Sequence, residues 1–285
     1  MDIAVMSDIH GNYVALKQCI QYALERNINT FIFLGDYAGE LAYPQKTMEM
    51  LYRLSSQYTC YFIKGNKEDY WINYRTNGER GWIDKNSTTG ALLYTYNHLT
   101  EKDIIFFQDL SHKSEVVVER MPRLTICHGS PNRTNEKLLP ANENTFQVMD
   151  KSENSIILCG HTHVQCKIEH NGKVVLNPGS VGVSLHAAGK AQFLILHGQN
   201  NNWSEEFICV DYDIERVIND LHESGLSVSA PYWCIVTENL LRTGEISHGS
   251  VLTRAMQYCV EDKGFCNWPD VPEKYWKQAV NEMIG

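Results

Sequence analysis

The feature that most constrains this chain is a short apolar run that ends in two potential metal ligands. Ile3-Ala4-Val5-Met6 is followed directly by Ser7-Asp8-Ile9-His10-Gly11-Asn12. The run has the length of a buried strand, and Gly11-Asn12 is typical of the loop after a strand. Sites in α/β proteins are built where strands end, and a carboxylate and an imidazole two positions apart can bind one cation there. We therefore expect a metal site at this strand end, provided that other strands supply further ligands.

Four further apolar runs, at 30–34, 60–63, 124–127 and 155–159, end in the same way. The side chains that follow them are Asp36, Asn66, His128, and His161 with His163. Each of these residues alone would more often be a turn or core residue, but together they indicate a metal site. Oxygen and imidazole ligands without a thiolate suit Mn, Fe, Zn or Co. Two cations about 3.5–4 Å apart need one bridging carboxylate, and Asp36, the middle carboxylate, is the expected bridge.

Helical segments between these runs predict an α/β fold. Residues 14–26 place apolar side chains at helical spacing, and residues 44–55 do so after a proline that favours a helix start. A further short helix is expected within 131–153. A hairpin is predicted through Asn171-Gly172, with further strands at 115–119, 192–197 and 206–212. This alternation indicates a sheet with helices packed on it.

Two stretches are expected to add to a core domain of residues 1–212. Residues 68–100 are aromatic and polar, and they predict an inserted helical cap near the site. Residues 213–285 form a helical C-terminal extension, with Asp211 as the expected cap of a helix that ends at Gly225 and a second helix at 250–259. The extension is too aromatic to be disordered. We expect it to pack on the core or to form a homo-oligomer contact.

Composition excludes several classes of protein. A chain of 285 residues with 43% hydrophobic residues can bury a full core. No apolar run approaches the ~20 residues needed to cross a bilayer, and the start lacks the basic region of a signal peptide. Nine cysteines without a C-x-x-C pair are typical of a reducing compartment, so a cytoplasmic location is expected. The net charge of -9 argues against broad nucleic-acid binding, although bound metal would allow an anionic small substrate.

The blocks described above resemble the calcineurin-like metallophosphoesterases in order and spacing. The matching blocks are Asp8-x-His10, Gly35-Asp36, Gly65-Asn66, His128-Gly129 and Gly160-His161-Thr162-His163. The loop Asn177-Pro178-Gly179-Ser180 is similar to the small prokaryotic branch of this family, which includes phosphodiesterases and dinucleoside polyphosphate hydrolases. The resemblance covers roughly residues 1–212. It implies an α/β (α+β) fold in which two mixed β-sheets pack as a sandwich with helices outside.

The resemblance also implies a ligand set for two divalent ions, with manganese favoured. The set divides into Asp8, His10 and His163 for one ion, Asn66, His128 and His161 for the other, and Asp36 as the bridge. The implied reaction is direct attack of a metal-bridging hydroxide on phosphorus, in line with the leaving oxygen.

One position departs from the wider family. Many relatives carry histidine after Gly-Asn, whereas Lys67 follows Gly65-Asn66 here. Lysine binds phosphate well but is a poor acid at neutral pH unless its pKa falls, so good leaving groups are favoured and the general acid stays open. Asn12 and Arg133 are further candidates for substrate contact. The alternatives are that Asn12 only closes its own turn, and that Lys67 and Arg133 are solvated surface charges.

The other histidines match no motif and are interpreted as structural or exposed: His98, His112, His170, His186, His197, His222 and His248. The aromatic residues between Tyr70 and Tyr96 are interpreted as cap core. An alternative is that Trp71 or Trp82 stacks on a nucleobase.

The leading prediction is a two-metal phosphoesterase that cleaves a phosphodiester or phosphoanhydride bond in a small, nucleotide-type substrate, with Asp36 and Lys67 as catalytic residues. One alternative is a phosphomonoesterase or protein phosphatase. The other is a scaffold that keeps the fold without catalysis.

Overall fold

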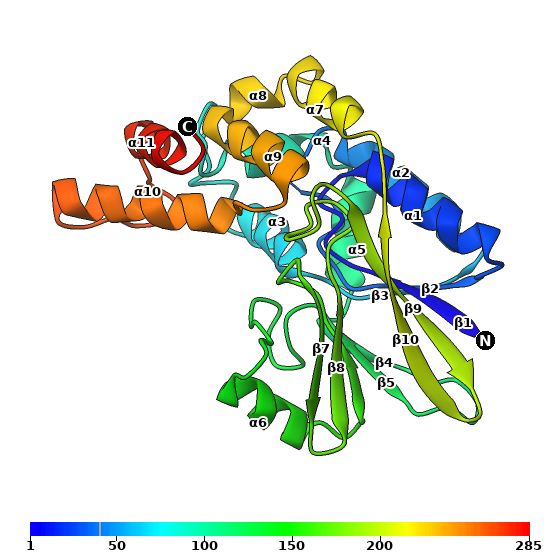
Figure 1. The fold of residues 1–285 in the computed structure, drawn as a ribbon. Helices are drawn as coiled ribbons and strands as arrows, with labels where there is room; N and C mark the ends of the chain where they lie inside the picture. The colour runs from blue at the N-terminus through cyan, green and yellow to red at the C-terminus, as the bar shows by residue number, and fades with distance from the viewer. Residues whose placement is uncertain (40) are drawn as a thin grey trace.

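Two mixed five-stranded sheets form the centre of the computed structural model, which describes residues 1–39 and 41–285 (Figure 1). The first sheet has the order β10-β9-β1-β2-β3, with β1, β2 and β3 parallel. The second has the order β4-β5-β6-β8-β7, with β5, β6 and β8 parallel. The predicted sandwich of two mixed sheets is confirmed.

The strands of the first sheet are β1 (Asp2–Met6), β2 (Thr30–Phe33), β3 (Thr59–Phe62), β9 (Ala191–Gln199) and β10 (Asn202–Val210). Those of the second are β4 (Lys113–Val116), β5 (Leu124–Cys127), β6 (Ile156–Leu158), β7 (Gln165–His170) and β8 (Lys173–Pro178). Each lies where an apolar run or the predicted hairpin placed a strand, with ends that differ by a few residues.

Apolar side chains at alternate positions bury both faces of the first sheet. Ile3 and Val5 of β1 cluster with Leu124 and Ile126 of β5 between the two sheets. Ala4 and the other outward-facing residues of the sheet pack instead under helices. Successive strand residues point to opposite faces, so both faces of this strand need apolar residues. A continuous apolar run, rather than an alternating one, is the consequence.

Helices cover the outer faces of both sheets. Over the first lie α1 (Tyr13–Glu25), α2 (Pro44–Ser55) and α5 (Glu101–Asp109), and α6 (Glu143–Lys151) packs on the second. The helices predicted at 14–26, at 44–55 and within 131–153 are confirmed. Between the third strand and α5 lie α3 (Asn66–Thr76) and α4 (Gly90–His98).

The C-terminal extension is helical and packs on itself and on α4. Its helices are α7 (Ile214–Glu223), α8 (Leu226–Ser229), α9 (Pro231–Thr243), α10 (His248–Lys263) and α11 (Glu273–Met283). Ala91 and Tyr94 of α4 share one apolar core with residues of these helices, such as Trp276. The stretch 68–100 and the extension therefore form one continuous helical layer beside the sandwich (Figure 1).

Two details of the extension differ from the sequence prediction. Asp213, rather than Asp211, caps α7, because its carboxylate accepts a hydrogen bond from the Arg216 amide. The helices α9 and α11 were not predicted, although Pro231 at the first helical position and Gly244 after the last are typical helix boundaries.

The nine cysteines are all free. Within the described ranges, the chain contains no helix with the length and apolar character required to span a bilayer.

Candidate active site

The carboxyl ends of the parallel strands in both sheets meet at one edge of the sandwich. The loops after β1, β2 and β3 carry Asp8 with His10, Asp36 and Asn66, and those after β5 and β6 carry His128 and His161 with His163. Backbone hydrogen bonds hold neighbouring loops together beyond the strands, among them His10 N to Asp36 O at 2.9 Å and Gly160 N to His128 O at 2.7 Å. The topology thus brings side chains that are more than 150 positions apart in the sequence into one site.

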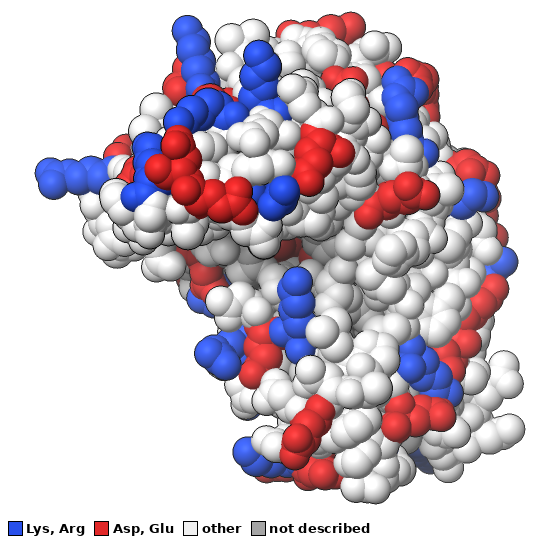
Figure 2. Space-filling view, turned by 60° about the vertical axis from the view of Figure 1, so that its left-hand side comes forward, with Lys and Arg blue, Asp and Glu red and all other residues white. Residues whose placement is uncertain are grey.

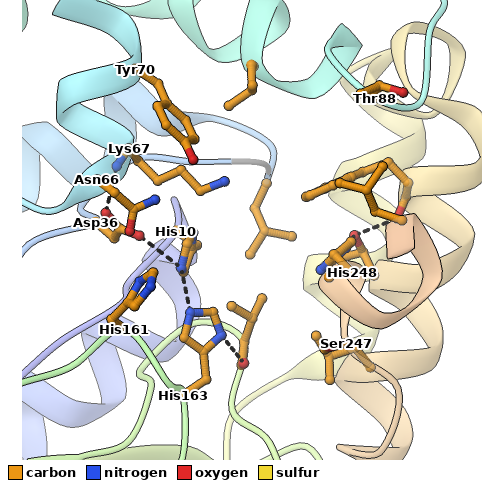
Figure 3. Close-up of a pocket in the computed structure, with 18 of the residues that line it drawn as sticks. His10, Asp36, Asn66, Lys67, Tyr70, Thr88, His161, His163, Ser247 and His248 are labelled. Atoms are coloured by element: carbon orange, nitrogen blue, oxygen red, sulfur yellow. Dashed lines mark hydrogen bonds and ion pairs between the residues drawn. The ribbon is translucent and has the colours of Figure 1, made fainter. Parts of the chain in front are cut away.

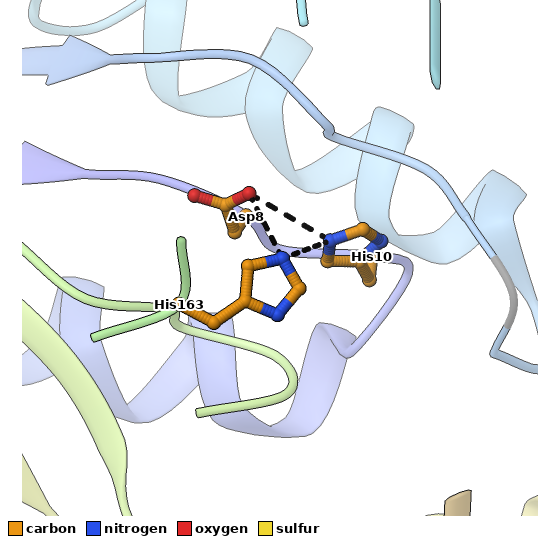
Figure 4. A group of neighbouring side chains, drawn as sticks. All are labelled: Asp8, His10 and His163. Atoms are coloured by element: carbon orange, nitrogen blue, oxygen red, sulfur yellow. Dashed lines mark hydrogen bonds and ion pairs between the residues drawn. The ribbon is translucent and has the colours of Figure 1, made fainter. Parts of the chain in front are cut away.

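Asp8, His10 and His163 form one group of potential ligands (Figure 4). His163 Nε2 lies 3.2 Å from Asp8 Oδ1 and 3.2 Å from His10 Nε2. His10 Nε2 lies 3.8 Å from the same carboxylate oxygen. Three donor atoms that converge in this way can bind a single cation.

Asp8, Asp36 and His128 form a second group beside the first. Asp36 Oδ2 lies 3.5 Å from His128 Nε2 and 3.7 Å from His10 Nε2, so it faces both groups. Asn66 Oδ1 lies 3.1 Å from His128 Nε2, and the rings of His128 and His161 are 5.1 Å apart. Asp8 thus belongs to both groups, and Asp36 lies close to a histidine of each.

Hydrogen bonds from the second ring nitrogen orient two of the histidines, His128 and His163, toward the site. His128 Nδ1 lies 2.7 Å from the Leu34 carbonyl oxygen, and His163 Nδ1 lies 3.2 Å from the Val183 carbonyl oxygen. A carbonyl only accepts, so Nδ1 donates in each pair and Nε2 remains available to a cation. This arrangement of the second nitrogen is the usual one for a metal-binding histidine.

The carboxylate of Asp8 gives an independent indication that a cation fits here. Its Oδ2 accepts hydrogen bonds from the Ser7 hydroxyl at 2.6 Å and from the His161 amide at 3.0 Å. Its Oδ1 is buried without a hydrogen-bond partner among the described residues and faces the histidine rings. A buried polar atom of this kind needs an explanation, and a divalent cation held by the two groups supplies one.

Backbone strain marks the same residues. Asp8, His10, Asp36, His161 and His163 all have positive φ angles, between 51° and 66°. A residue other than glycine rarely adopts this conformation, at a cost on the order of 1–3 kcal/mol. Strain of this kind concentrates at functional sites, where the surrounding structure holds it in place.

Burial and neighbouring charges shift the pKa of two of these residues, Asp8 and His161. Burial alone would raise the pKa of Asp8, but the nearby His128 and His163 hold it well below its usual range. Burial lowers the pKa of His161 to about 4, with the charge of His128 acting in the same direction. At neutral pH the site therefore offers the ionised carboxylate of Asp8 and the unprotonated imidazole of His161, which are the forms that bind metal.

Residues 1–201 match the model of the calcineurin-like phosphoesterase superfamily domain. The chain belongs to this superfamily. An uncharacterised protein of Methanocaldococcus jannaschii is 26% identical over 251 residues, which are 81% of this chain and 94% of that protein.

Two solved structures share the fold. A hypothetical protein from Pyrococcus horikoshii has a TM-score of 0.71 at 19% identity, over 86% of this chain and 99% of that one. A metallophosphoesterase from Sphaerobacter thermophilus has a TM-score of 0.66 at 21% identity, over 82% and 99% of the two chains. Membership of the calcineurin-like phosphoesterase superfamily implies divalent metal ions, and the two Asp/His groups are their candidate ligands.

Glu68 holds the loops that carry the candidate ligands Asp36 and Asn66, and the sequence analysis did not predict it. Its buried carboxylate accepts hydrogen bonds from the amides of Gly65, Asp36 and Tyr37, at 2.7, 2.9 and 3.0 Å. Burial and then the charge of Asp36 raise its pKa to about 7, against the effect of these three amides. The available signal was its place three residues after Gly65, where a glutamate closes a capping box at the start of α3.

Glu68→Gln should lower metal affinity by about 10- to 100-fold, the range for residues that orient metal ligands. The amide NH₂ group would face backbone N–H groups that now donate to a carboxylate, so the loops carrying Asp36 and Asn66 would shift. Titration calorimetry with Mn²⁺ measures the effect, and Glu143→Gln, an exposed change at the start of α6, is the control. Unchanged Mn²⁺ affinity in Glu68→Gln would show that the carboxylate does not position the ligands.

A cavity of about 250 Å³ opens in front of the ligands (Figure 3). One side carries His10, Asp36, Asn66, His161 and His163, with Lys67 and Tyr70 beside them. The opposite side is formed by the C-terminal extension, through Trp233, Thr237, Ser247, His248 and Trp268. His248, which the sequence analysis interprets as structural or exposed, also lines this cavity. No local motif marks it, since it reaches the site only through the packing of α9 and α10.

Two predicted substrate contacts lie elsewhere. Asn12 is buried and caps α1: its side chain accepts from the Ala15 amide and donates to the Gly182 carbonyl. Arg133 is paired with Glu136 at 3.3 Å, with 71% of its side chain exposed. It lines a neighbouring cavity that shares Asn66 and Tyr70 with the first.

The structure also shows where the two tryptophans considered for nucleobase stacking lie. Trp71 is fully buried in the core of the first sheet and cannot stack on a ligand. Trp82 lies face to face with Tyr74, at 4.0 Å between ring centres. Among the aromatic residues described, Trp233 and Trp268 are the tryptophans that line the cavity of the metal ligands.

Proposed function

We propose that this chain is a two-metal phosphoesterase that hydrolyses a phosphodiester or phosphoanhydride bond in a small, nucleotide-type substrate. The observation that carries the proposal is the position of Asp36, whose Oδ2 faces His10 in one ligand group and His128 in the other. Such a carboxylate suits a pair of cations, with Asp8, His10 and His163 for one and Asn66, His128 and His161 for the other. Manganese fits this set of oxygen and imidazole ligands.

Divalent cations held there would lower the pKa of water and neutralise the charge that develops on a phosphoryl group. The chain's own residues would then orient the substrate. Asn66 and Lys67 begin the helix α3, and the positive end of its dipole favours a phosphate nearby. The Lys67 amide donates to Asp36 Oδ1 at 2.9 Å, which fixes the carboxylate beside this helix end. The Lys67 side chain extends into the cavity (Figure 3), where an ammonium group would bind a phosphate oxygen.

The cavity also bears on substrate size. Its volume of about 250 Å³ is below the ~300–1,000 Å³ of most ligand pockets, which favours a small ester over a polymer. Lys and Arg are interspersed with Asp and Glu over the face that contains this hollow (Figure 2). A mixed surface of this kind does not favour a nucleic-acid polyanion, which binds to clustered positive charge. The nine free cysteines support a cytoplasmic location.

Hydrolysis of bis(p-nitrophenyl) phosphate, p-nitrophenyl phosphate and diadenosine tetraphosphate tests the proposal, with Mn²⁺ and with chelator. We expect Mn²⁺-dependent cleavage of the diester or the dinucleotide in preference to the monoester. Lys67→Ala should raise KM severalfold without loss of bound metal, whereas Arg133→Ala, the matched control, should change neither. Protein that binds metal but cleaves none of the three would overturn the proposal and favour a scaffold.

A further inference from the structure

One wall of the cavity faces the candidate metal ligands. It lies outside the part of the chain that matches the phosphoesterase domain. The superfamily match ends at residue 201, whereas Trp233, His248 and Trp268 come from the extension. Figure 3 shows Ser247 and His248 across the cavity from His10, His161 and His163. The superfamily domain therefore supplies the candidate metal ligands, and residues that follow it in the sequence supply the surface opposite them.

The side chain of Lys67 reaches from the ligand side of the cavity toward the opposite wall. Lys67 follows the ligand Asn66, and its Nζ lies 5.5 Å from the ring centre of Tyr70 and 5.8 Å from that of Trp233. Both distances are within the ~6 Å at which an ammonium group interacts with an aromatic ring. A phosphate bound between the metal ligands and Lys67 would thus direct its organic substituent toward Trp233 and its neighbours.

The wall is aromatic and is held in place by its own contacts. His248 stacks on Trp233, with ring centres 4.0 Å apart and 19° between the planes. Its Nε2 lies 2.7 Å from Thr237 Oγ1, and the Thr237 hydroxyl also contacts the Trp233 carbonyl at 2.9 Å. These contacts fix the ring of His248 against the tryptophan. The surface is therefore pre-organised, which reduces the entropy lost when a ligand binds.

Trp268 completes the wall from the segment between α10 and α11. It packs at 6.1 Å from Tyr70, with 34° between the ring planes, and is nevertheless 45% exposed. Apolar side chains line the cavity between the two walls: Leu41, Leu92, Val183, Leu240 and Leu252. An indole that is half exposed beside an apolar cavity offers a face on which a planar ring can stack.

We propose that Trp233, His248, Trp268 and Tyr70 form a specificity subsite that binds a planar, uncharged ring attached to the scissile phosphate. The ring is an aryl group or a nucleobase, since both present the same flat, apolar face. The cavity volume allows one such ring beside a phosphate. This inference rests on the proposed function and deepens it, because it assigns the substrate's organic group to the extension.

Titration calorimetry on Mn²⁺-loaded protein tests the subsite without turnover. Methylphosphonate reports the metal and phosphate site alone, and phenylphosphonate adds one planar ring. We expect phenylphosphonate to bind about tenfold more tightly, within the range for stacking of one ring on aromatic side chains. Trp268→Ala should remove most of this preference, and Trp268→Phe should retain it. Phe265→Ala changes an exposed aromatic residue of the same segment that does not line the cavity, and it should behave as wild type.

AMP and ribose 5-phosphate, titrated in the same way, distinguish the two kinds of ring. A Trp268-dependent preference for AMP would support a nucleobase, and a preference for phenylphosphonate alone would support a simple aryl group. Equal binding of phenylphosphonate and methylphosphonate, or an unchanged preference in folded Trp268→Ala, would overturn the subsite and leave the proposed function standing. If Mn²⁺-loaded protein binds no methylphosphonate, the proposed function fails, and the subsite fails with it.

Discussion

Asp36→Asn should reduce Mn²⁺-dependent hydrolysis by more than about 100-fold, because residues that only orient ligands already change affinity or activity by 10- to 100-fold. The substitution keeps the shape of the side chain, and its Oδ1 can still accept from the Lys67 amide. It removes the negative charge that faces both His10 and His128. If the amide nitrogen took the Oδ2 position, it would also present donors where a cation needs an acceptor. Bound metal should therefore fall together with activity.

Metal content by elemental analysis and the rate with bis(p-nitrophenyl) phosphate measure the two effects. Asp150→Asn is the matched control, because Asp150 is an exposed carboxylate paired with His170 and Asn171 on the second sheet's side of the molecule. Near-normal metal content and rate in Asp36→Asn would show that Asp36 does not bridge the two ligand groups.

Gly65→Ala should destabilise the protein and disrupt the site, for a reason that is purely tertiary. The backbone of Gly65 is extended, with φ of -96° and ψ of -174°. Alanine readily adopts this conformation. A Cβ atom would, however, lie 2.1 Å from Asp36 Oδ1 and 2.6 Å from the Asp36 amide nitrogen. The loops after β2 and β3 would have to separate. Overpacking of this kind costs about 1–3 kcal/mol, which corresponds to a fall of several degrees in Tm.

Thermal unfolding followed by circular dichroism, with and without Mn²⁺, checks this prediction. Displacement of Asp36 should also diminish the rise in Tm that Mn²⁺ produces in the wild type, since a ligand that binds the native state less tightly stabilises it less. In Gly249→Ala, the control, the nearest atom to the new Cβ is Ser247 Oγ at 3.9 Å, so neither Tm nor metal content should fall. A wild-type melting curve for Gly65→Ala would mean that the two loops are less closely packed than described.

Much of the candidate site could be predicted because the end of a strand has a recognisable local sequence pattern. The runs before Asp8, Asp36 and His128 are short, apolar and followed by polar residues, and each forms a strand with its predicted ligand just beyond. The carboxyl ends of parallel strands lie at the same edge of a sheet, so strand order alone brings the ligands together. The positive φ angles of five ligands could not be predicted, because they depend on hydrogen bonds between loops.

Where a local pattern had two readings, the tertiary structure decided between them. Asp211 and Asp213 are both plausible helix caps, and only the position of the Arg216 amide decides between them. Trp71 lies in an aromatic stretch that could be core or ligand platform, and its complete burial decides for the core. Glu68 follows the Gly65-Asn66 motif, but the role of its carboxylate became visible only from its hydrogen bonds to the loops after β2 and β3.

By itself the sequence determined the strands, most of the helices and the candidate metal ligands of this phosphoesterase, because hydrophobic periodicity and residue chemistry are local properties. It did not determine what faces those ligands. Trp233, His248 and Trp268 reach the cavity because the helices of the extension share one apolar core with α4, far away in the sequence. Such contacts arise from the burial of apolar surface between elements and leave no spacing in the chain that a motif could reveal. Only the tertiary structure therefore decided which residues face the candidate metal ligands across the cavity.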